Sequence, residues 1–149
     1  MLNIVPQTDP VLRQPAQPVT VFNSKIRQIA KEMLALMKEN RGVGLAAPQV
    51  GISQQIIVIN TDKNINALAL INPQILARST STEEDTEGCL SLPGVSLKIN
   101  RARKISVAFQ DEFGHPREIK AKRLTARVLQ HEIDHLNGIL ITDYTKTEK

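Results

Sequence analysis

Apolar and polar positions follow a helical period in two parts of the chain. From Ser24 to about Asn40 apolar side chains recur every three or four residues, as on one face of an amphipathic helix. Asn23 or Ser24 is placed to cap its N-terminus. The same spacing returns from about Leu124 to Asn137, followed by Gly138, where a left-handed helix stop is expected. We therefore predict one N-terminal and one C-terminal helix.

The residues between these helices form short runs that are typical of strands. We predict strands at Gln55–Asn60, Leu68–Ile71, Gln74–Arg78, Val95–Ile99, Lys104–Gln110, Arg117–Lys120 and, near the end, Ile139–Ile141. Residues 111–116 are predicted to be a hairpin turn, which makes the flanking strands antiparallel. Residues 41–53 hold three glycines and a proline, so we expect a partly buried loop, and the four prolines within residues 1–23 favour an extended or turn-like arm. With no repeat and no linker, residues 1–149 are interpreted as a single α+β domain of mostly antiparallel short strands.

Composition narrows the class of protein. Of the 149 residues 41% are hydrophobic and 23% are charged, which is typical of a globular domain. A net charge of +4 gives a weakly basic surface that favours an anionic partner only slightly, while three Phe, one Tyr and no Trp argue against base stacking and hence against specific nucleic-acid binding. The single cysteine excludes an internal disulfide, and no secretion signal or membrane-spanning run is evident. We expect a cytoplasmic protein, most simply a monomer.

The segment Gln130–His135 contains the pattern His-Glu-x-x-His inside the predicted C-terminal helix. Residues four apart lie on the same helix face, so His131 and His135 can share one metal ion. Apolar residues cover two opposite sides of this helix, which predicts that it is buried and that its histidines are inside. Two satisfied core histidines are the alternative, but the pattern should arise by accident in well under about one in a hundred chains of this length.

A catalytic metal site of this kind needs a third protein ligand. The only glutamate after His135 is Glu148, in the polar tail, and Ile141 stands where one protease group has a third histidine. The ligand is therefore expected upstream. Cys89 is the best candidate because thiolate binds zinc and ferrous iron well. His115 is the rival, but a hairpin tip beside Pro116 is expected to be exposed.

Three segments together resemble the signature motifs of the peptide deformylase family, in order and at the usual separations. They are Gly42-Val43-Gly44-Leu45-Ala46-Ala47-Pro48-Gln49, Glu87-Gly88-Cys89-Leu90-Ser91 and Gln130-His131-Glu132-Ile133-Asp134-His135. The resemblance implies removal of the formyl group from the initiator methionine of nascent chains. It also implies one divalent metal ion, with Fe²⁺ expected first and Zn²⁺ or Ni²⁺ as substitutes, and N-formyl-methionyl peptides as substrates.

The resemblance also assigns roles to individual residues. The metal ligands fall on Cys89, His131 and His135, and the acid/base falls on Glu132. Gln49 and the backbone N–H of Leu90 would polarise the formyl oxygen, and Gly44 would bind substrate through its main chain. For Gln49 alone, a loop-bracing amide is the alternative. These roles agree with general chemistry, in which a base activates metal-bound water and hydrogen-bond donors meet the developing oxyanion.

Apolar residues that flank the motifs predict a pocket for an apolar first side chain. Val43 lies in the first motif, and Leu124 and Val128 share the histidine face of the helix. Arg127 stands where some relatives have an aliphatic pocket residue. Either its stem lines the pocket while its charge reaches water, or substrate preference differs.

Two other functions remain open from the sequence. One is a metal-dependent peptidase or amidase that cuts internal bonds. The other is a catalytically inactive module that docks its basic surface on ribosomal RNA, although an intact Glu132 and Cys89 speak against it. Bacterial relatives commonly continue into a further C-terminal helix, whereas this sequence stops at Lys149, so a ribosome-docking role of that helix is not carried over. Any ribosome contact would use the weak basic surface.

Overall fold

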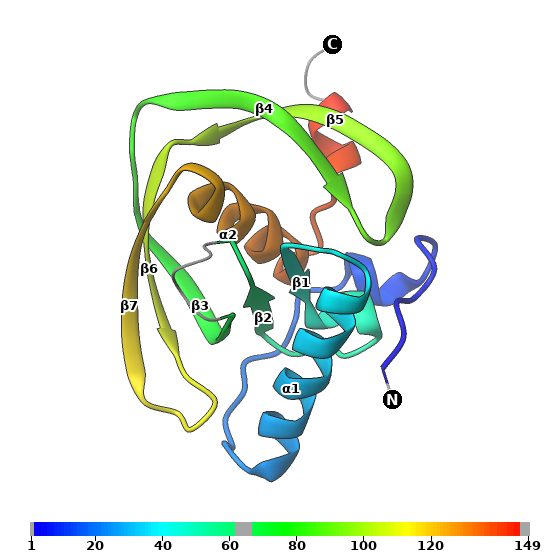
Figure 1. Cartoon of the computed structure of the whole chain (residues 1–149), viewed down its shortest axis with the longest axis vertical. Coiled ribbons are helices and arrows are strands. Elements are labelled where there is room, and N and C mark those ends of the chain that lie inside the picture. The colour runs from blue at the N-terminus through cyan, green and yellow to red at the C-terminus, as the bar shows by residue number, and fades with distance from the viewer. Residues whose placement is uncertain (1, 62–66, 147–149) are drawn as a thin grey trace.

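The fold places two helices on a five-stranded sheet, with a separate two-stranded hairpin (Figure 1). It is seen in a computed structural model that describes residues 2–61 and 67–146. The helices are α1 (Ser24–Glu39) and α2 (Arg123–Leu136), close to the two predicted ones. Asn23 caps α1 by accepting a hydrogen bond from the backbone N–H of Ile26, and Gly138 follows α2 with a φ of 74°. The α+β class is confirmed.

All pairings in the large sheet are antiparallel, in the order β1-β2-β3-β6-β7. The strands are β1 (Gly44–Ala46), β2 (Ile56–Ile59), β3 (Leu68–Arg78), β6 (Lys104–Gln110) and β7 (Pro116–Lys122). The predicted strands at 68–71 and 74–78 are one irregular strand, with register shifts on both sides of Ile75. Asn72 lies in the first of these irregularities with a φ of 53°, and its side chain bonds to the backbone of Val19 and to Gln110.

Strand β2 separates two hydrophobic clusters. Ile57 and Ile59 belong to the cluster that contains the buried residues of α2, whereas Ile56 and Val58 belong to the cluster with those of α1. Successive side chains of a strand point to opposite faces, so one helix covers each face of the sheet. α2 packs against β1, β2, β6 and β7 on one side and against the hairpin on another, which confirms that this helix is buried.

The hairpin consists of β4 (Thr82–Cys89) and β5 (Leu92–Ala102), and in Figure 1 it arches over α2. We did not predict β4, because Thr-Glu-Glu-Asp-Thr-Glu-Gly-Cys has few residues with high strand propensity. β5 was predicted only as Val95–Ile99. Pairing along nearly the whole length of both strands overrides the weak local preference. This hairpin delivers Cys89 to α2.

Two further expectations need correction. The run Ile139–Ile141 is not a strand: a 3-10 helix, η3, covers Ile141–Lys146. The loop predicted for residues 41–53 holds β1 and a 3-10 helix, η2 (Ala47–Val50), and the N-terminal arm holds another, η1 (Pro10–Arg13). Within residues 2–61 and 67–146, no helix combines the length and apolar character that crossing a membrane would require.

Candidate metal centre

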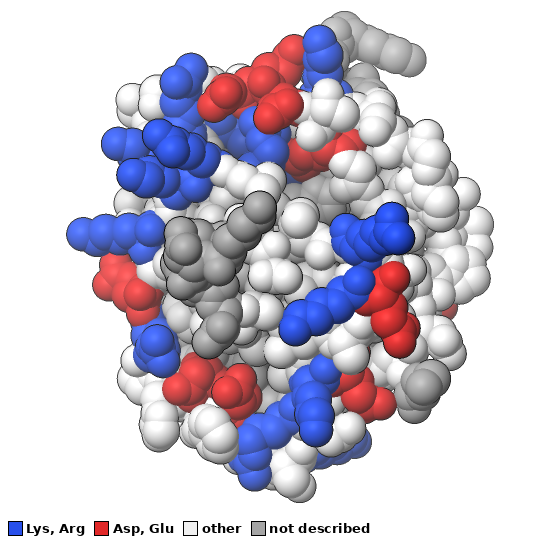
Figure 2. Space-filling view, in the orientation of Figure 1, with Lys and Arg blue, Asp and Glu red and all other residues white. Residues whose placement is uncertain are grey.

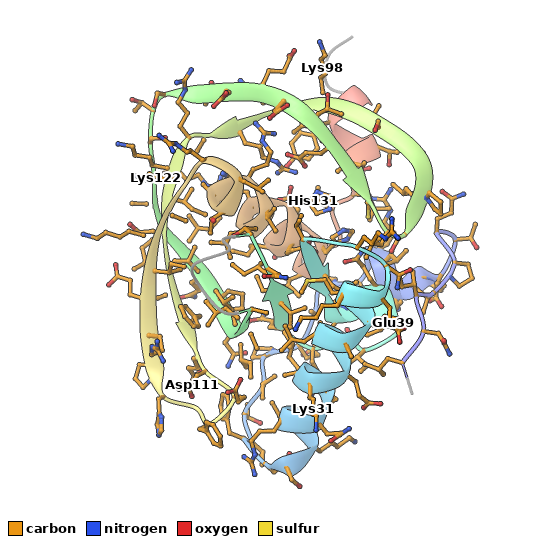
Figure 3. The ribbon with its side chains drawn as sticks, in the orientation of Figure 1. Lys31, Glu39, Lys98, Asp111, Lys122 and His131 are labelled. Carbon is orange, nitrogen blue, oxygen red and sulfur yellow. The ribbon has the colours of Figure 1, made fainter. Side chains whose placement is uncertain are left out.

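Three potential ligands from two elements converge beneath the hairpin. Cys89 ends β4, and His131 and His135 lie one turn apart on α2. Their ligand atoms all lie within 4.8 Å of one another, and Cys89 Sγ is 3.4 Å from Nε2 of His135. A thiolate with two imidazoles is a donor set that suits zinc or ferrous iron. These three residues could therefore hold one ion. In Figure 3 the labelled His131 lies in the middle of the molecule.

The rival ligand lies elsewhere. The side chain of His115 is 74% exposed, near the tip of the β6–β7 hairpin, and pairs with Asp111. The predicted turn is present, because Asp111 N–H donates to the carbonyl of His115 and Gly114 adopts a φ of 86°. His115 is thus outside the cluster, as we expected.

His131 is oriented by Glu87. The Nδ1 atom of His131 lies 2.9 Å from Oε1 of Glu87, so Nδ1–H donates to this carboxylate and leaves Nε2 for the site. Burial alone would raise the pKa of Glu87, but hydrogen bonds from Arg101 and His131 outweigh it and lower the pKa to about 2. Glu87 is therefore a buried, charged acceptor.

The two histidines differ electrostatically. Burial, with the nearby charges of His131 and Arg101, lowers the pKa of His135 to about 3, so its ring is neutral. Burial also lowers the pKa of His131, but the charge of Glu132 and hydrogen bonds to Cys89 and Glu87 outweigh it and raise the pKa to about 10. Among the protein groups alone, the cluster thus favours one positive charge at His131. A bound cation would take the place of that proton, as expected for metal sites.

Glu132 is a buried carboxyl group beside this cluster. Its side chain is 5% exposed, Oε2 lies 3.9 Å from Nε2 of His131, and Oε1 has no hydrogen-bond partner among the residues that the structure describes. Burial raises the pKa of Glu132 to about 7. A carboxyl group with a pKa near neutrality can accept and release a proton at neutral pH.

Gln49 is held by hydrogen bonds at both ends of its amide. Oε1 accepts from the backbone N–H of Ala46 at 2.9 Å, while Nε2 donates to Ser91 Oγ at 3.1 Å and lies 3.4 Å from Cys89 Sγ. The loop-bracing interpretation is therefore correct for the oxygen. The nitrogen faces the cluster, where a donor can reach a ligand, so bracing and a site role are compatible.

A cavity of about 400 Å³ opens beside the cluster and brings together the predicted pocket residues. Its lining includes Gly44, Gln49, Leu90 and Glu132. Val128 is buried, whereas Val43 and Leu124 are 43% and 48% exposed and lie at the mouth. The cavity could therefore take an apolar side chain of a substrate.

Arg127 lines this cavity, but its charge does not reach water as one of our alternatives supposed. Its guanidinium donates to Oε2 of Glu87 at 2.6 Å and to the carbonyl oxygens of Ile99 and Glu83 at 2.8 and 2.7 Å. These partners lie on both hairpin strands. They hold the positive charge against the hairpin.

The sequence analysis assigned no role to Glu87 or to Arg101, which together with Arg127 forms hydrogen bonds to the Glu87 carboxylate. Glu87 and Cys89 are two residues apart, so on a strand both side chains point to the same face. That signal was lost because β4 was not predicted.

Comparisons with known proteins identify the family of this chain. The polypeptide deformylase family model matches residues 1–149. The peptide deformylase of Synechococcus sp. (strain CC9605) is 50% identical over 138 residues, which cover 91% of this chain and 69% of the relative. The structure of the Thermotoga maritima enzyme has a TM-score of 0.93 at 44% identity and covers 96% of both chains. For the Synechococcus elongatus enzyme in complex with actinonin the TM-score is 0.91 at 45% identity, with coverage of 95% and 77%. The chain therefore belongs to the polypeptide deformylase family of metal-dependent hydrolases.

Proposed function

We propose that this deformylase removes the formyl group from the initiator formyl-methionine of nascent chains, with Cys89, His131 and His135 as metal ligands. The observation that carries the proposal is the convergence of these ligand atoms within 4.8 Å, beside a buried oxygen of Glu132 that has no hydrogen-bond partner among the described residues. A bound divalent ion would supply Lewis-acid chemistry and lower the pKa of water. The thiolate and imidazole donors favour Fe²⁺, with Zn²⁺ or Ni²⁺ as substitutes.

Glu132 is the proton carrier in this proposal. Its pKa, raised by burial to about 7, lets it take a proton from the attacking water and return it to the departing amine. Its neighbour on the helix, His131, is kept in place by Glu87, so the distance between base and metal site is fixed by α2 and β4. Glu132 needs no role as a ligand.

Gln49 is proposed to stabilise the oxyanion. Its carbonyl end is fixed by Ala46, and its Nε2 donates to Ser91 Oγ and lies 3.4 Å from Cys89 Sγ, so the amide nitrogen is held beside the cluster before substrate arrives. Donors that are already in place pay no reorganisation cost when charge develops. We assign the second donor to the backbone N–H of Leu90, which follows Cys89 and lines the cavity, and backbone contacts to substrate to Gly44.

The cavity supports methionine as the first residue. Val43, Leu124 and Val128 provide an apolar lining, and an unbranched, flexible side chain fits such a space well. An enzyme that cuts internal peptide bonds would use the same ion and glutamate. The family match and the cysteine ligand favour deformylation.

The test is hydrolysis of formyl-Met peptides against the same peptides carrying an acetyl group, and against internal bonds in an acetylated peptide. We expect turnover of the formyl substrate alone, with formate as product. Cleavage of an internal bond at a comparable rate would overturn the proposal. Each reaction is repeated with Glu132→Gln to exclude a contaminating enzyme.

We also propose a cytoplasmic location and a weak ribosome contact by a monomer. Lys and Arg gather at the upper left of Figure 2, and Arg78, Lys104, Lys120 and Lys122 line one groove on β3, β6 and β7. Such a surface would attract ribosomal RNA through its phosphates in a salt-dependent way. Cosedimentation with ribosomes that is lost in moderate salt would support this contact, and its absence at low salt would overturn it.

A further inference from the structure

A tyrosine of the C-terminal 3-10 helix η3 forms hydrogen bonds with residues next to the candidate metal centre. The Tyr144 hydroxyl accepts a hydrogen bond from Nη1 of Arg101 at 2.9 Å and donates one to Oδ2 of Asp134. The Arg101 guanidinium also lies 4.8 Å from the centroid of the Tyr144 ring. One side chain of η3 therefore contacts both a buried arginine of β5 and an acid of α2.

Arg101 is fixed on two sides. Its Nε and Nη2 donate to Oε2 and Oε1 of Glu87 at 2.9 and 2.8 Å, as a bidentate fork. On the other side Nη1 donates to Asp134 at 2.6 Å and to Tyr144. The arginine side chain is only 4% exposed, so water cannot easily replace a lost partner.

The same carboxylate of Glu87 receives Nδ1–H of His131 at 2.9 Å. A continuous series of hydrogen bonds thus runs from Tyr144 through Arg101 and Glu87 to a proposed metal ligand. The orientation of a ligand imidazole, and with it the affinity for the ion, depends on the acceptor of its other ring nitrogen.

We propose that Tyr144 is a positioning residue for His131, acting through Arg101 and Glu87. The inference rests on the proposed metal role of His131. Without the hydroxyl, Nη1 of Arg101 keeps Asp134 as its one hydrogen-bond partner among the described residues, and Asp134 loses a donor. Fewer contacts then fix the position of the guanidinium, so its two hydrogen bonds to Glu87 are weakened. The Glu87 carboxylate, and with it the His131 ring, becomes less well oriented.

A purely structural role of Tyr144 is the competing explanation. Its side chain packs against the small cluster of Leu92, Ile99 and Ile141, which attaches η3 to the hairpin. Tyr144→Phe keeps the ring, its packing and its contact with Arg101, and removes only the hydroxyl. This variant separates positioning from packing.

Arg13→Ala is the matched control. Arg13 donates to Asp143 at 2.6 Å and to the carbonyl of Gly138 at 3.2 Å, so it ties η3 and the segment before it to the N-terminal arm. Within the part of the chain that the structure describes, Arg13 makes no hydrogen bond or ion pair with Arg101, Glu87 or the proposed metal ligands. A general loosening of η3 would follow from Arg13→Ala as well, whereas loss of the positioning contact would not.

The experiment measures Co²⁺ binding to the full chain by competition with a chelator, together with the visible spectrum of the Co²⁺ form. For Tyr144→Phe we expect the affinity for Co²⁺ to be about tenfold weaker and the ligand-field spectrum to be altered. This loss is at the lower end of what is seen when a residue hydrogen-bonded directly to a metal ligand is mutated. With formyl-Met peptide, kcat should fall while KM changes by less than about twofold. Arg13→Ala should change none of these.

Two results would overturn the proposal: Tyr144→Phe with unchanged affinity and spectrum, or an equal loss of affinity in Arg13→Ala. The unsubstituted protein and the Cys89→Ala variant are measured first. If the unsubstituted protein bound no Co²⁺, or if Cys89→Ala bound it equally tightly, the metal site itself would be wrong and the proposed function would fail with this inference. Normal binding in the unsubstituted protein with an unaffected Tyr144→Phe rejects the role of Tyr144 alone.

Discussion

The backbone of Gly44 lies directly against the side chain of Glu132. A Cβ atom at Gly44 would be 2.7 Å from Oε2 of Glu132 and 2.6 Å from Cγ1 of Val128. Neither distance is compatible with ordinary packing, so β1 can approach α2 only because this residue has no side chain. The requirement is for space, since the φ of Gly44 is not in the left-handed region.

Gly44→Ala is therefore expected to displace the proposed base. A shift of about 1 Å in a reacting group can cost about a hundredfold in rate, so we expect kcat/KM to fall by about that factor. Metal content should stay at one ion per chain, because the ligands are not touched. Activity close to that of the unsubstituted protein would show that the side chains of Glu132 and Val128 can shift without a loss of activity.

Cys89→Ala should abolish tight metal binding. The substitution removes the only upstream member of the cluster and leaves two histidines, which are too few for a tight site. Metal content after dialysis, by elemental analysis, measures the effect. His115→Ala is the control, because His115 is exposed and outside the cluster. Undiminished metal affinity in Cys89→Ala would contradict the ligand assignment.

Glu132→Gln should separate metal binding from proton transfer. The amide keeps the shape of the side chain but cannot act as a base, so we expect retained metal and kcat lowered by at least about a hundredfold. Glu84→Gln, a change at an exposed position of β4, is the matched control. Turnover near the original value in Glu132→Gln would contradict the mechanism.

Local patterns predicted the elements that carry strong periodicity. The helix with His131 and His135 and the strand Lys104–Gln110 follow from apolar spacing, which depends only on nearby residues. β4 could not be predicted in this way, because its acidic residues are stabilised as a strand by pairing with β5. The strand predicted at Ile139–Ile141 was wrong for a related reason: Ile141 packs into the small cluster of η3, and no strand partner lies beside it among the described residues.

Residues of the candidate site that belong to a sequence motif could be predicted. Residues that are linked to it only by tertiary contacts were missed. Cys89, His131 and His135 were grouped from the sequence, and the structure brings them together. Arg101 and Tyr144 belong to no motif that we used. Their link to Glu87 and Asp134 exists only once the hairpin and η3 are folded onto α2.

Selectivity for an apolar first side chain should be strong. A formyl-Asp peptide would bring a carboxylate against the apolar lining formed by Val43, Leu124 and Val128. Arg127, the arginine of α2 that lines the cavity, is already engaged by Glu87 and two carbonyl groups. We therefore expect kcat/KM for formyl-Asp to be at least about a hundredfold below that for formyl-Met, given the cost of burying an unpaired charge. Equal rates would mean that an arginine of the lining pairs with the substrate carboxylate, either Arg127 after leaving Glu87 or Arg41.

Oxidation should inactivate the iron form through Cys89. The thiol is half-buried at the edge of the cavity, so oxygen or peroxide that enters the cavity can reach it. A thiolate ligand stays electron-rich, and the sequence has one cysteine, so a sulfenic acid cannot be resolved as an internal disulfide and should oxidise further.

We expect the Fe²⁺ form to lose activity in air, while the Zn²⁺ or Ni²⁺ form resists, because ferrous iron is itself oxidised by oxygen and generates reactive species beside the thiolate. Mass spectrometry of the inactive protein should find added oxygen on the Cys89 peptide, with metal released in the same proportion. The anaerobically stored Fe²⁺ form is the control and should keep both its thiol and its ion. An iron form that remains fully active after prolonged exposure to air, with an unmodified Cys89, would show that neighbours of the sulfur such as Gln49, whose Nε2 lies 3.4 Å from it, shield it from oxidants.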